Sequence, residues 1–210
     1  MTNACRLYLV TPKLSLADLD AFAPRFAAAL AAGDVASALA RLAPGAEADS
    51  KRIVARLADT AAAADVALLV ENDARLAARS GADGCHVAGA GEELRRALAS
   101  LQPERIVGAG QLRLRDDAMS AGEAGADYVM FGEPRPDGWA PPLDETLDRV
   151  GWWAEIFETP CVAFAASLDA VAPLAAAGAD FVALDEAVWG APSPESAVVE
   201  ANRRIAQRSD

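Results

Sequence analysis

A glycine followed closely by an aspartate and then by a short apolar run recurs four times along this chain. The four glycines are Gly33, Gly81, Gly125 and Gly178, at intervals of 48, 44 and 53 residues. Each follows an alanine-rich stretch, so the glycine suits the left-handed residue that ends a helix and the apolar run suits the next strand. Intervals of this size hold about two βα units each. The four repeats therefore predict eight strands, the number in a (β/α)₈ barrel.

The apolar runs also predict where the strands end, and active sites on this fold lie at the strand C-termini. One domain over residues 1–210 is long enough for the pattern. The alternative is an open doubly wound sheet, but Val10-Thr11-Pro12-Lys13 stands where that fold has its glycine-rich turn. The expected strand C-termini lie near Thr11, Leu39, Val70, Val87, Gly108, Phe131, Phe164 and Leu184.

Composition restricts the partners of the chain. The net charge of −12 argues against nucleic acid or an anionic membrane as a partner. No apolar run reaches transmembrane length and the N-terminus lacks a secretory pattern, so we expect a soluble, cytoplasmic protein. Cys5, Cys85 and Cys161 have no CxxC spacing, which predicts reduced and mostly buried thiols.

Two polar segments at predicted strand ends could carry chemistry. Asp73 suits a hard cation, although Asn72 or Asp73 could equally cap the following helix. His86 is the only histidine and could act as an acid or base, or could be a polar histidine of the core. Its neighbour Cys85 points to the opposite face of the strand, so the two form no dyad.

Positive charge near the same end of the barrel comes from three arginines. Arg41, Arg113 and Arg115 could hold an anion, because guanidinium suits phosphate and carboxylate. The alternative for Arg115 is a surface salt bridge with Asp116 and Asp117. An unrelated barrel enzyme that uses a Schiff base is disfavoured, because neither of the two lysines of the chain stands at a strand end expected to carry one.

Tryptophans predict a contact surface. Trp139 lies in a proline-rich loop and could stack on a flat ring or pack in a dimer. Trp152 and Trp153 are adjacent on a predicted helix, so one is expected in the core and the other at a subunit interface. We therefore expect a homodimer.

At several strand ends the chain resembles thiamine phosphate synthase, a family that also contains thiazole tautomerases. The resemblance implies a TIM barrel, commonly dimeric, that joins a pyrimidine diphosphate to a thiazole phosphate and releases pyrophosphate, with Mg²⁺ on the diphosphate. Its segments span nearly the whole chain: Tyr8-Leu9-Val10-Thr11, Glu71-Asn72-Asp73, Gly84-Cys85-His86-Val87, Gly125-Ala126-Asp127-Tyr128-Val129 with Gly132, and Pro160-Cys161-Val162-Ala163 with Gly178-Ala179-Asp180.

The resemblance, together with the arginine positions, gives a candidate site for a small phosphorylated or heteroaromatic ligand. No residue is assigned a catalytic role. Asp73 is the expected ligand of Mg²⁺. The expected substrate-binding residues are Arg41, Asn72, His86, Arg113 and Gly132.

The sequence departs from the family pattern where that pattern binds phosphate and metal. Ala165-Ala166 replaces Gly-Gly after strand seven, and Asp185-Glu186 replaces Ser after strand eight. Gly89-Ala90-Gly91 stands where a second metal-binding aspartate is expected, and Glu133-Pro134-Arg135-Pro136-Asp137 replaces a threonine-rich loop. Methyl groups obstruct backbone N–H donors and carboxylates repel phosphate. We expect a divergent member with degraded phosphate and metal sites; the alternative is an inactive small-ligand-binding or regulatory paralogue.

Overall fold

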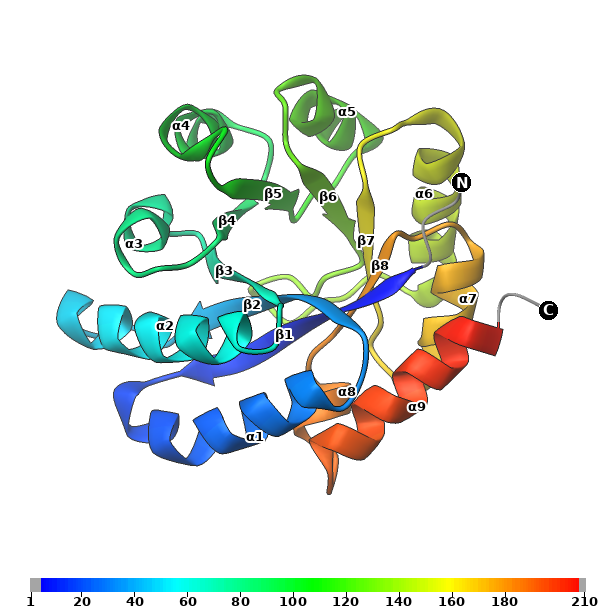
Figure 1. Ribbon diagram of the computed structural model, residues 1–210. Helices are drawn as coiled ribbons and strands as arrows, with labels where there is room; N and C mark the ends of the chain where they lie inside the picture. The colour runs from blue at the N-terminus through cyan, green and yellow to red at the C-terminus, as the bar shows by residue number, and fades with distance from the viewer. Residues whose placement is uncertain (1–4, 208–210) are drawn as a thin grey trace.

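The computed structural model describes residues 5–207, so both ends of the predicted 1–210 domain lie outside the described residues. Within them, eight parallel strands close into a barrel in the order β1 to β8, and helices surround it (Figure 1). The closed ring includes a parallel pairing of β8 with β1. The (β/α)₈ barrel is therefore confirmed, and the open doubly wound sheet is excluded.

Strands and helices alternate along the chain. The strands are β1 (Arg6–Leu14), β2 (Val35–Leu42), β3 (Ala67–Glu71), β4 (Gly84–Ala88), β5 (Ile106–Gly110), β6 (Tyr128–Phe131), β7 (Cys161–Phe164) and β8 (Phe181–Leu184). The helices are α1 (Leu19–Ala31), α2 (Glu47–Ala62), α3 (Ala74–Arg79), α4 (Glu92–Leu101), α5 (Arg115–Glu123), α6 (Leu143–Ile156), α7 (Val171–Ala176), α8 (Glu186–Trp189) and α9 (Pro194–Ala206).

Five strands extend beyond the predicted ends. β1 and β2 each run three residues further, as far as the pair Leu14 and Leu42. β5 ends at Gly110, and β3 and β4 each gain one residue. Apart from Leu14 and Leu42, the added residues are polar, small or proline, so the apolar pattern missed these strand ends. They are set by pairing with the neighbouring strand, which depends on tertiary structure.

Alternation along the strands divides the core into two layers. Leu7 and Leu9 of β1 face the helices, whereas Tyr8 and Val10 face the barrel interior. The interior layer is small, with apolar side chains and two tyrosines. Its buried members are Tyr8, Val10, Leu39, Leu69, Tyr128, Met130, Val162, Phe164 and Ala183.

The repeated glycines have two different roles. Gly81, Gly125 and Gly178 have φ of +82°, +95° and +105°, as predicted for left-handed residues that follow a helix. The prediction is wrong for Gly33, which lies outside that region. A Cβ on Gly33 would fall 2.4 Å from the Asn202 side chain, so the glycine is required by the close approach of α9.

The repeated aspartates stabilise the N-terminal end of the barrel, which is opposite the strand C-termini. Asp34 accepts a hydrogen bond from the Arg6 side chain at 2.7 Å. In each of the other three, the aspartate carboxylate accepts a hydrogen bond from the backbone N–H of a residue on the preceding strand. The backbone N–H of the aspartate then donates to the C=O of that same strand residue. The pairs are Asp83 with Leu68, Asp127 with Val107, and Asp180 with Cys161. The repeat therefore serves stability, as expected at this face.

Serine side chains stand at the start of three helical segments. Ser15 and Asp18 form a capping box, and Ser193 accepts a hydrogen bond from the N–H of Ser196 at the start of α9. Ser167 makes no such bond, and a short 3₁₀ turn (Leu168–Ala170) precedes α7. Cys5, Cys85 and Cys161 are buried, as predicted. Among the helices that the structure describes, none has the length and apolarity needed to cross a membrane.

Candidate active site

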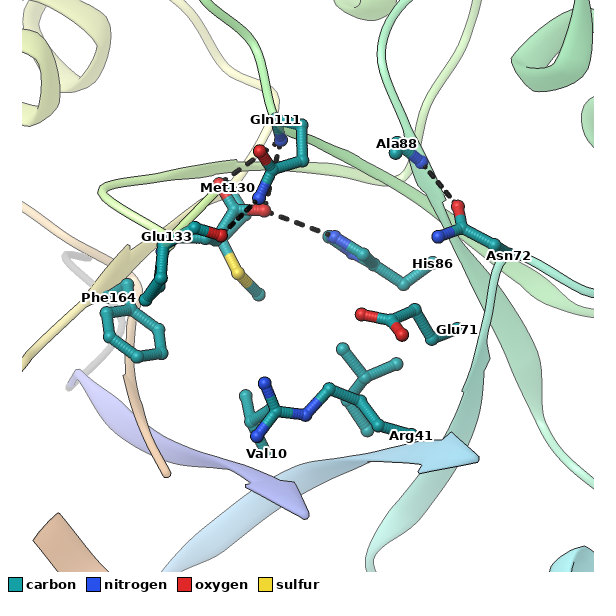
Figure 2. A pocket seen from close by; sticks show the side chains of 12 residues that line it. Val10, Arg41, Glu71, Asn72, His86, Ala88, Gln111, Met130, Glu133 and Phe164 are labelled. Carbon is teal, nitrogen blue, oxygen red and sulfur yellow. Dashed lines mark hydrogen bonds and ion pairs between the residues drawn. The ribbon is translucent and has the colours of Figure 1, made fainter. Parts of the chain in front are cut away.

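A small pocket of about 60 Å³ opens at the C-terminal mouth of the barrel (Figure 2). That volume is well below the range of drug-sized ligand sites, roughly 300–1,000 Å³. Strand ends from most of the barrel contribute to its walls, which combine apolar side chains with two carboxylates, one guanidinium and one imidazole. The lining residues are Val10, Leu39, Arg41, Glu71, Asn72, His86, Ala88, Gln111, Met130, Glu133, Pro134 and Phe164.

The His86 ring lies below the pocket because β5 leaves room for it. His86, Gly108 and Tyr128 are register partners on β4, β5 and β6. A Cβ on Gly108 would fall 2.0 Å from the Tyr128 ring, so the missing side chain lets His86 and Tyr128 meet across β5. Their rings stack with centroids 5.7 Å apart.

A hydrogen-bonded chain runs from this ring into the barrel interior. The Tyr128 hydroxyl lies 2.8 Å from His86 Nδ1 and 2.9 Å from the Tyr8 hydroxyl. Burial raises the pKa of both tyrosines far above the usual value, so both keep their protons. His86 is buried, as expected for a polar histidine of the core, and its edge also reaches the pocket, so a role as acid or base stays a prediction.

Glu133 faces the other edge of the imidazole. Its Oε1 atom is 3.4 Å from His86 Nε2, and the backbone N–H of Gln111 donates to the same carboxylate at 3.1 Å. Gln111 has φ of +54°, a left-handed conformation directly after β5. Its side chain donates to the C=O of Pro134 at 2.8 Å, so the two loops are joined.

Arg41 lies at the mouth as predicted, but its guanidinium already has partners. Its Nε atom donates to the C=O of Thr11 at 2.6 Å, and a terminal nitrogen is 3.4 Å from the carboxylate of Asp185. The side chains of Arg41 and Asp185 are 22% and 18% exposed, so this pair is only partly accessible. An incoming anion would have to compete with a carboxylate for Arg41.

Asn72 and Asp73 follow β3 and were predicted to bind substrate and Mg²⁺ respectively. In the structure the two adjacent residues have different surroundings. Asn72 has φ of +54° and lines the pocket, where its Oδ1 accepts a hydrogen bond from the N–H of Ala88. Asp73 caps α3 by accepting the N–H of Leu76 at 2.8 Å. It lies outside the lining of the mouth pocket and beside a different surface hollow.

Arg113 and Gly132 lie in a hollow next to the mouth pocket rather than in it. Gly132 has φ of +91°, and a Cβ there would collide with Thr146. Arg113 is exposed in that hollow, where Arg149 donates to its C=O. The two pockets share Gln111 and Glu133, so this hollow adjoins the mouth.

Arg115 forms a surface salt bridge, but not with the predicted partners. It pairs with Asp148 of α6 at 2.8 Å and lies over the Trp152 ring, instead of pairing with the neighbouring aspartates. The reason is that the start of α5 faces α6. Trp153 is fully buried and Trp152 is half-buried, as the adjacent positions predicted.

Trp139 is 44% exposed in the loop between β6 and α6. The Arg135 guanidinium lies 3.9 Å from the centre of its ring, so one face of the ring is covered by a cation. Stacking on a ligand, or packing in a dimer, therefore stays a prediction for this side chain.

Two of the backbone N–H groups after β7 and β8 already have partners. The N–H of Ala165 donates to the C=O of Ala183 at 2.8 Å. The N–H of Glu186 donates to the carboxylate of Asp185. The Glu186 carboxylate lies back toward Gly190, where a Cβ would meet it. Of the two acidic residues, Asp185 is the one that faces Arg41.

Several lining residues were not predicted as site residues from the sequence. Glu71 stands at a strand end beside Asn72, and strand-end position alone could have indicated it. Gln111 and Glu133 had no such pattern, because each lies in a loop whose direction depends on left-handed residues. Successive residues of a strand face the helices and the barrel interior in turn. The place of Tyr8 and Tyr128 in the interior could therefore have been predicted from their positions along β1 and β6.

The fold is that of a (β/α)₈-barrel protein, and a pocket lies at the C-terminal mouth of its barrel. The chain belongs to the thiamine monophosphate synthase family, whose model matches residues 7–188.

Similar proteins agree with that assignment over nearly the full length. The chain is 43% identical to a thiamine-phosphate synthase of Rhodospirillum centenum, over 95% of this chain and 97% of the relative. It is 36% identical to a thiamine-phosphate synthase of Hyphomonas neptunium, over 93% and 91%. The solved thiamine phosphate pyrophosphorylase from Pyrococcus furiosus superposes with a TM-score of 0.82 at 22% identity, over 100% of this chain and 99% of that one. This last likeness confirms the fold.

Proposed function

We propose that the protein is a divergent thiamine monophosphate synthase homologue whose mouth pocket binds a small heteroaromatic or phosphorylated ligand and whose synthase turnover is low. The observation that supports this most directly is Asp185, whose carboxylate is engaged with both Arg41 and the N–H of Glu186. Those are the two kinds of donor that a phosphate would use. Apolar walls such as Met130 and Phe164 suit a flat ring.

The residues present do not fit a magnesium ion held by the protein. A hard cation needs several oxygen ligands, and here Asp73 is occupied as a helix cap. Within the part of the chain that the structure describes, no three acidic, histidine or cysteine side chains gather as a metal site would require. The Mg²⁺ prediction from the family therefore lacks support in the donor set, and no step of the proposed function uses it.

A second candidate is an active synthase that holds its anionic groups differently. The names of the relatives favour synthase activity, and the hollow beside the mouth contains Arg113, Arg135 and Arg149. The three guanidinium groups of this hollow could hold phosphate without Arg41, although the chain as a whole is acidic. The further alternative is a paralogue that binds its ligand and has no turnover.

We also propose a homodimer that works in the cytoplasm. Leu114, Trp139 and Leu143 are each more than 40% exposed around the start of α5 and α6, which supports an apolar contact. The buried thiols of Cys85 and Cys161 suit a reducing compartment. Sedimentation equilibrium tests the dimer: a monomer throughout the range up to tens of micromolar, roughly where an interface of standard size holds, would contradict it.

A turnover assay tests the proposed function. Purified protein is given pyrimidine diphosphate, thiazole phosphate and Mg²⁺, and thiamine phosphate is measured; we expect fewer than about one turnover per second, the low end of ordinary enzymes. Asp185→Ser keeps a capping side chain and removes the carboxylate, so binding of thiazole phosphate should tighten. Glu186→Gln is the control, because that carboxylate faces away from Arg41.

The outcomes separate the candidates. Wild-type turnover at or above about one per second would establish the active synthase and overturn the proposal. Thermal stabilisation by thiazole phosphate or thiamine phosphate without turnover would favour the paralogue that only binds. Equal binding by Asp185→Ser and wild type would show that Asp185 does not restrict the anion site.

A further inference from the structure

The carboxylate of Glu133 is held at the mouth by donors from a different part of the barrel. The N–H of Gln111 donates to Oε1 at 3.1 Å and to Oε2 at 3.3 Å, and His86 Nε2 lies 3.4 Å from Oε1. The Glu133 side chain is only 12% exposed. A carboxylate so nearly buried requires such donors, because unpaired burial of the charge is costly. The donors come from β4 and the end of β5, whereas Glu133 comes from the loop after β6.

The tyrosine chain is compatible with His86 as one of those donors. Tyr8 and Tyr128 stay protonated, so the chain can run from Tyr8 through Tyr128 to His86 Nδ1 or in the reverse direction. The contact with Glu133 at 3.4 Å selects the first direction, in which the ring hydrogen of a neutral His86 is on Nε2, the edge that faces Glu133. The opposite tautomer would place the Nε2 lone pair against a carboxylate. The interior network therefore prepares an N–H donor at the pocket wall.

A missing side chain makes room for the anion. A Cβ on Gly110 would lie 2.0 Å from Glu133 Oε1 and 2.4 Å from His86 Nε2, so carboxylate and imidazole meet directly above that glycine. The left-handed conformation of Gln111 turns its N–H toward the same point. Glycine, a backbone N–H and an oriented side-chain N–H at one point are the components of an oxyanion site.

We propose that the Gln111 N–H and His86 Nε2–H form an oxyanion-binding site that Glu133 fills as a tethered carboxylate. The ligand group that it takes when Glu133 leaves is a carboxylate or phosphate oxyanion. The proposal does not depend on the proposed function, because it concerns anion binding whether or not thiamine phosphate is made. Glu133 therefore acts as a built-in competitor at the mouth.

Tethering explains why the Glu133 carboxylate occupies this site. A side chain on a short loop has an effective concentration on the order of millimolar or higher at its own site. A free anion must displace it, whereas a larger ligand could do so with additional contacts to the pocket. Removing the carboxylate should therefore tighten binding of small free anions, by about tenfold or more if this competition dominates.

The single histidine of the chain provides the measurement. In ¹⁵N NMR of the wild-type protein, His86 should have its proton on Nε2. Glu133→Ala is then titrated with sodium acetate and separately with inorganic phosphate, at ionic strength matched with sodium chloride. We expect saturable shifts at the Gln111 amide and the His86 ring, with an apparent dissociation constant at least about tenfold lower than in the wild type.

Glu133→Gln is the matched control. Its carboxamide oxygen keeps the volume and can still accept the N–H of Gln111, so anions should bind more weakly than in Glu133→Ala. Saturation by acetate alone would identify a carboxylate site, and saturation by phosphate alone a phosphate site; either supports the proposal. Folded Glu133→Ala that responds to both anions only as it does to chloride would overturn it. A wild-type His86 protonated on Nδ1 would overturn it too, even if the variant failed to fold.

Discussion

The hydroxyl oxygens of Tyr8 and Tyr128 lie 2.9 Å apart inside the barrel, on strands that are far apart in the sequence. Both side chains are nearly inaccessible to solvent. Their rings meet edge to face with centroids 5.9 Å apart. Because Tyr128 also contacts His86, the pair links the packed interior to the wall of the pocket.

Replacing Tyr128 should therefore cost more stability than replacing Tyr8. Tyr128→Phe leaves both the Tyr8 hydroxyl and His86 Nδ1 without their partner, so we expect unfolding free energy to fall by about 1–3 kcal/mol. Tyr8→Phe removes only the terminal hydroxyl and should cost about 0.5–1.5 kcal/mol. Urea unfolding of the two variants measures the difference. A larger loss for Tyr8→Phe would contradict the position of Tyr128 as the bridge between Tyr8 and His86.

The repeated aspartates should differ in importance. Asp180 accepts the N–H of Cys161 at 2.8 Å at the edge of the barrel, so Asp180→Ala should destabilise by about 1–3 kcal/mol. Asp34 makes an exposed ion pair with Arg6, and Asp34→Ala should cost about 0–1 kcal/mol. Thermal or urea unfolding compares the two variants. Equal losses would mean that the backbone hydrogen bond is no stronger than a surface pair.

Gly110 should not tolerate a side chain. Gly110→Ala places a methyl group against Glu133 and His86, so the variant should lose the Glu133 contact and about 1–3 kcal/mol of stability through overpacking. Gly45→Ala is the control, since its nearest contact would be 3.8 Å away and its change should stay within about 0.5 kcal/mol. Unfolding curves and the His86 NMR signals measure both effects. An unchanged His86 signal in Gly110→Ala would show that the space above this glycine is larger than the structure indicates.

Stability should fall at alkaline pH. Burial raises the pKa of the Cys85 thiol to about 11 and that of Cys161 to about 12, from a usual value of 9.0. The unfolded chain loses these protons first, so the stabilisation is complete below pH 9.0 and is lost as pH rises through the folded values. Each thiol contributes a slope of up to about 1.4 kcal/mol per pH unit in that window.

Urea unfolding at pH 7, 8, 9 and 10 tests this prediction, with Cys85→Ala as the variant that should reduce the slope. The thiols of the native protein should also react slowly with a thiol reagent at pH 8, because burial keeps them protonated and shielded. A stability that stays constant from pH 8 to pH 10, or fast labelling of native protein, would contradict the assigned burial.

The barrel could be predicted from the sequence because its determinants are local. Apolar runs and the glycine and aspartate spacing predicted the observed C-terminal ends of β6, β7 and β8. Gly33 was misassigned, because its requirement comes from α9, which the local pattern does not contain. The strand extensions of β1 and β2 were missed for the same reason.

Pocket residues that stand at strand ends could be predicted from the sequence, whereas those whose position depends on loop conformation could not. Arg41, Asn72 and His86 reach the mouth because parallel strands bring their C-termini together. Asp73 caps α3, which was one of the two alternatives open from the sequence, and Arg113 lies in a neighbouring hollow, which does not follow from its position along the chain.

By itself, the sequence determined the (β/α)₈ fold, because hydrophobic periodicity and strand polarity act locally. Its strand-end segments carry the resemblance that identifies the family. It also predicts the end of the barrel at which a ligand would bind, because parallel strands bring their C-termini together. Tertiary structure alone decided that Glu133 meets His86 and Gln111, and that Asp185 engages Arg41. These contacts join segments that approach only after the ring closes. Their partners depend on left-handed turns and on the absent side chains of Gly108 and Gly110, which set distances that no spacing along the chain encodes.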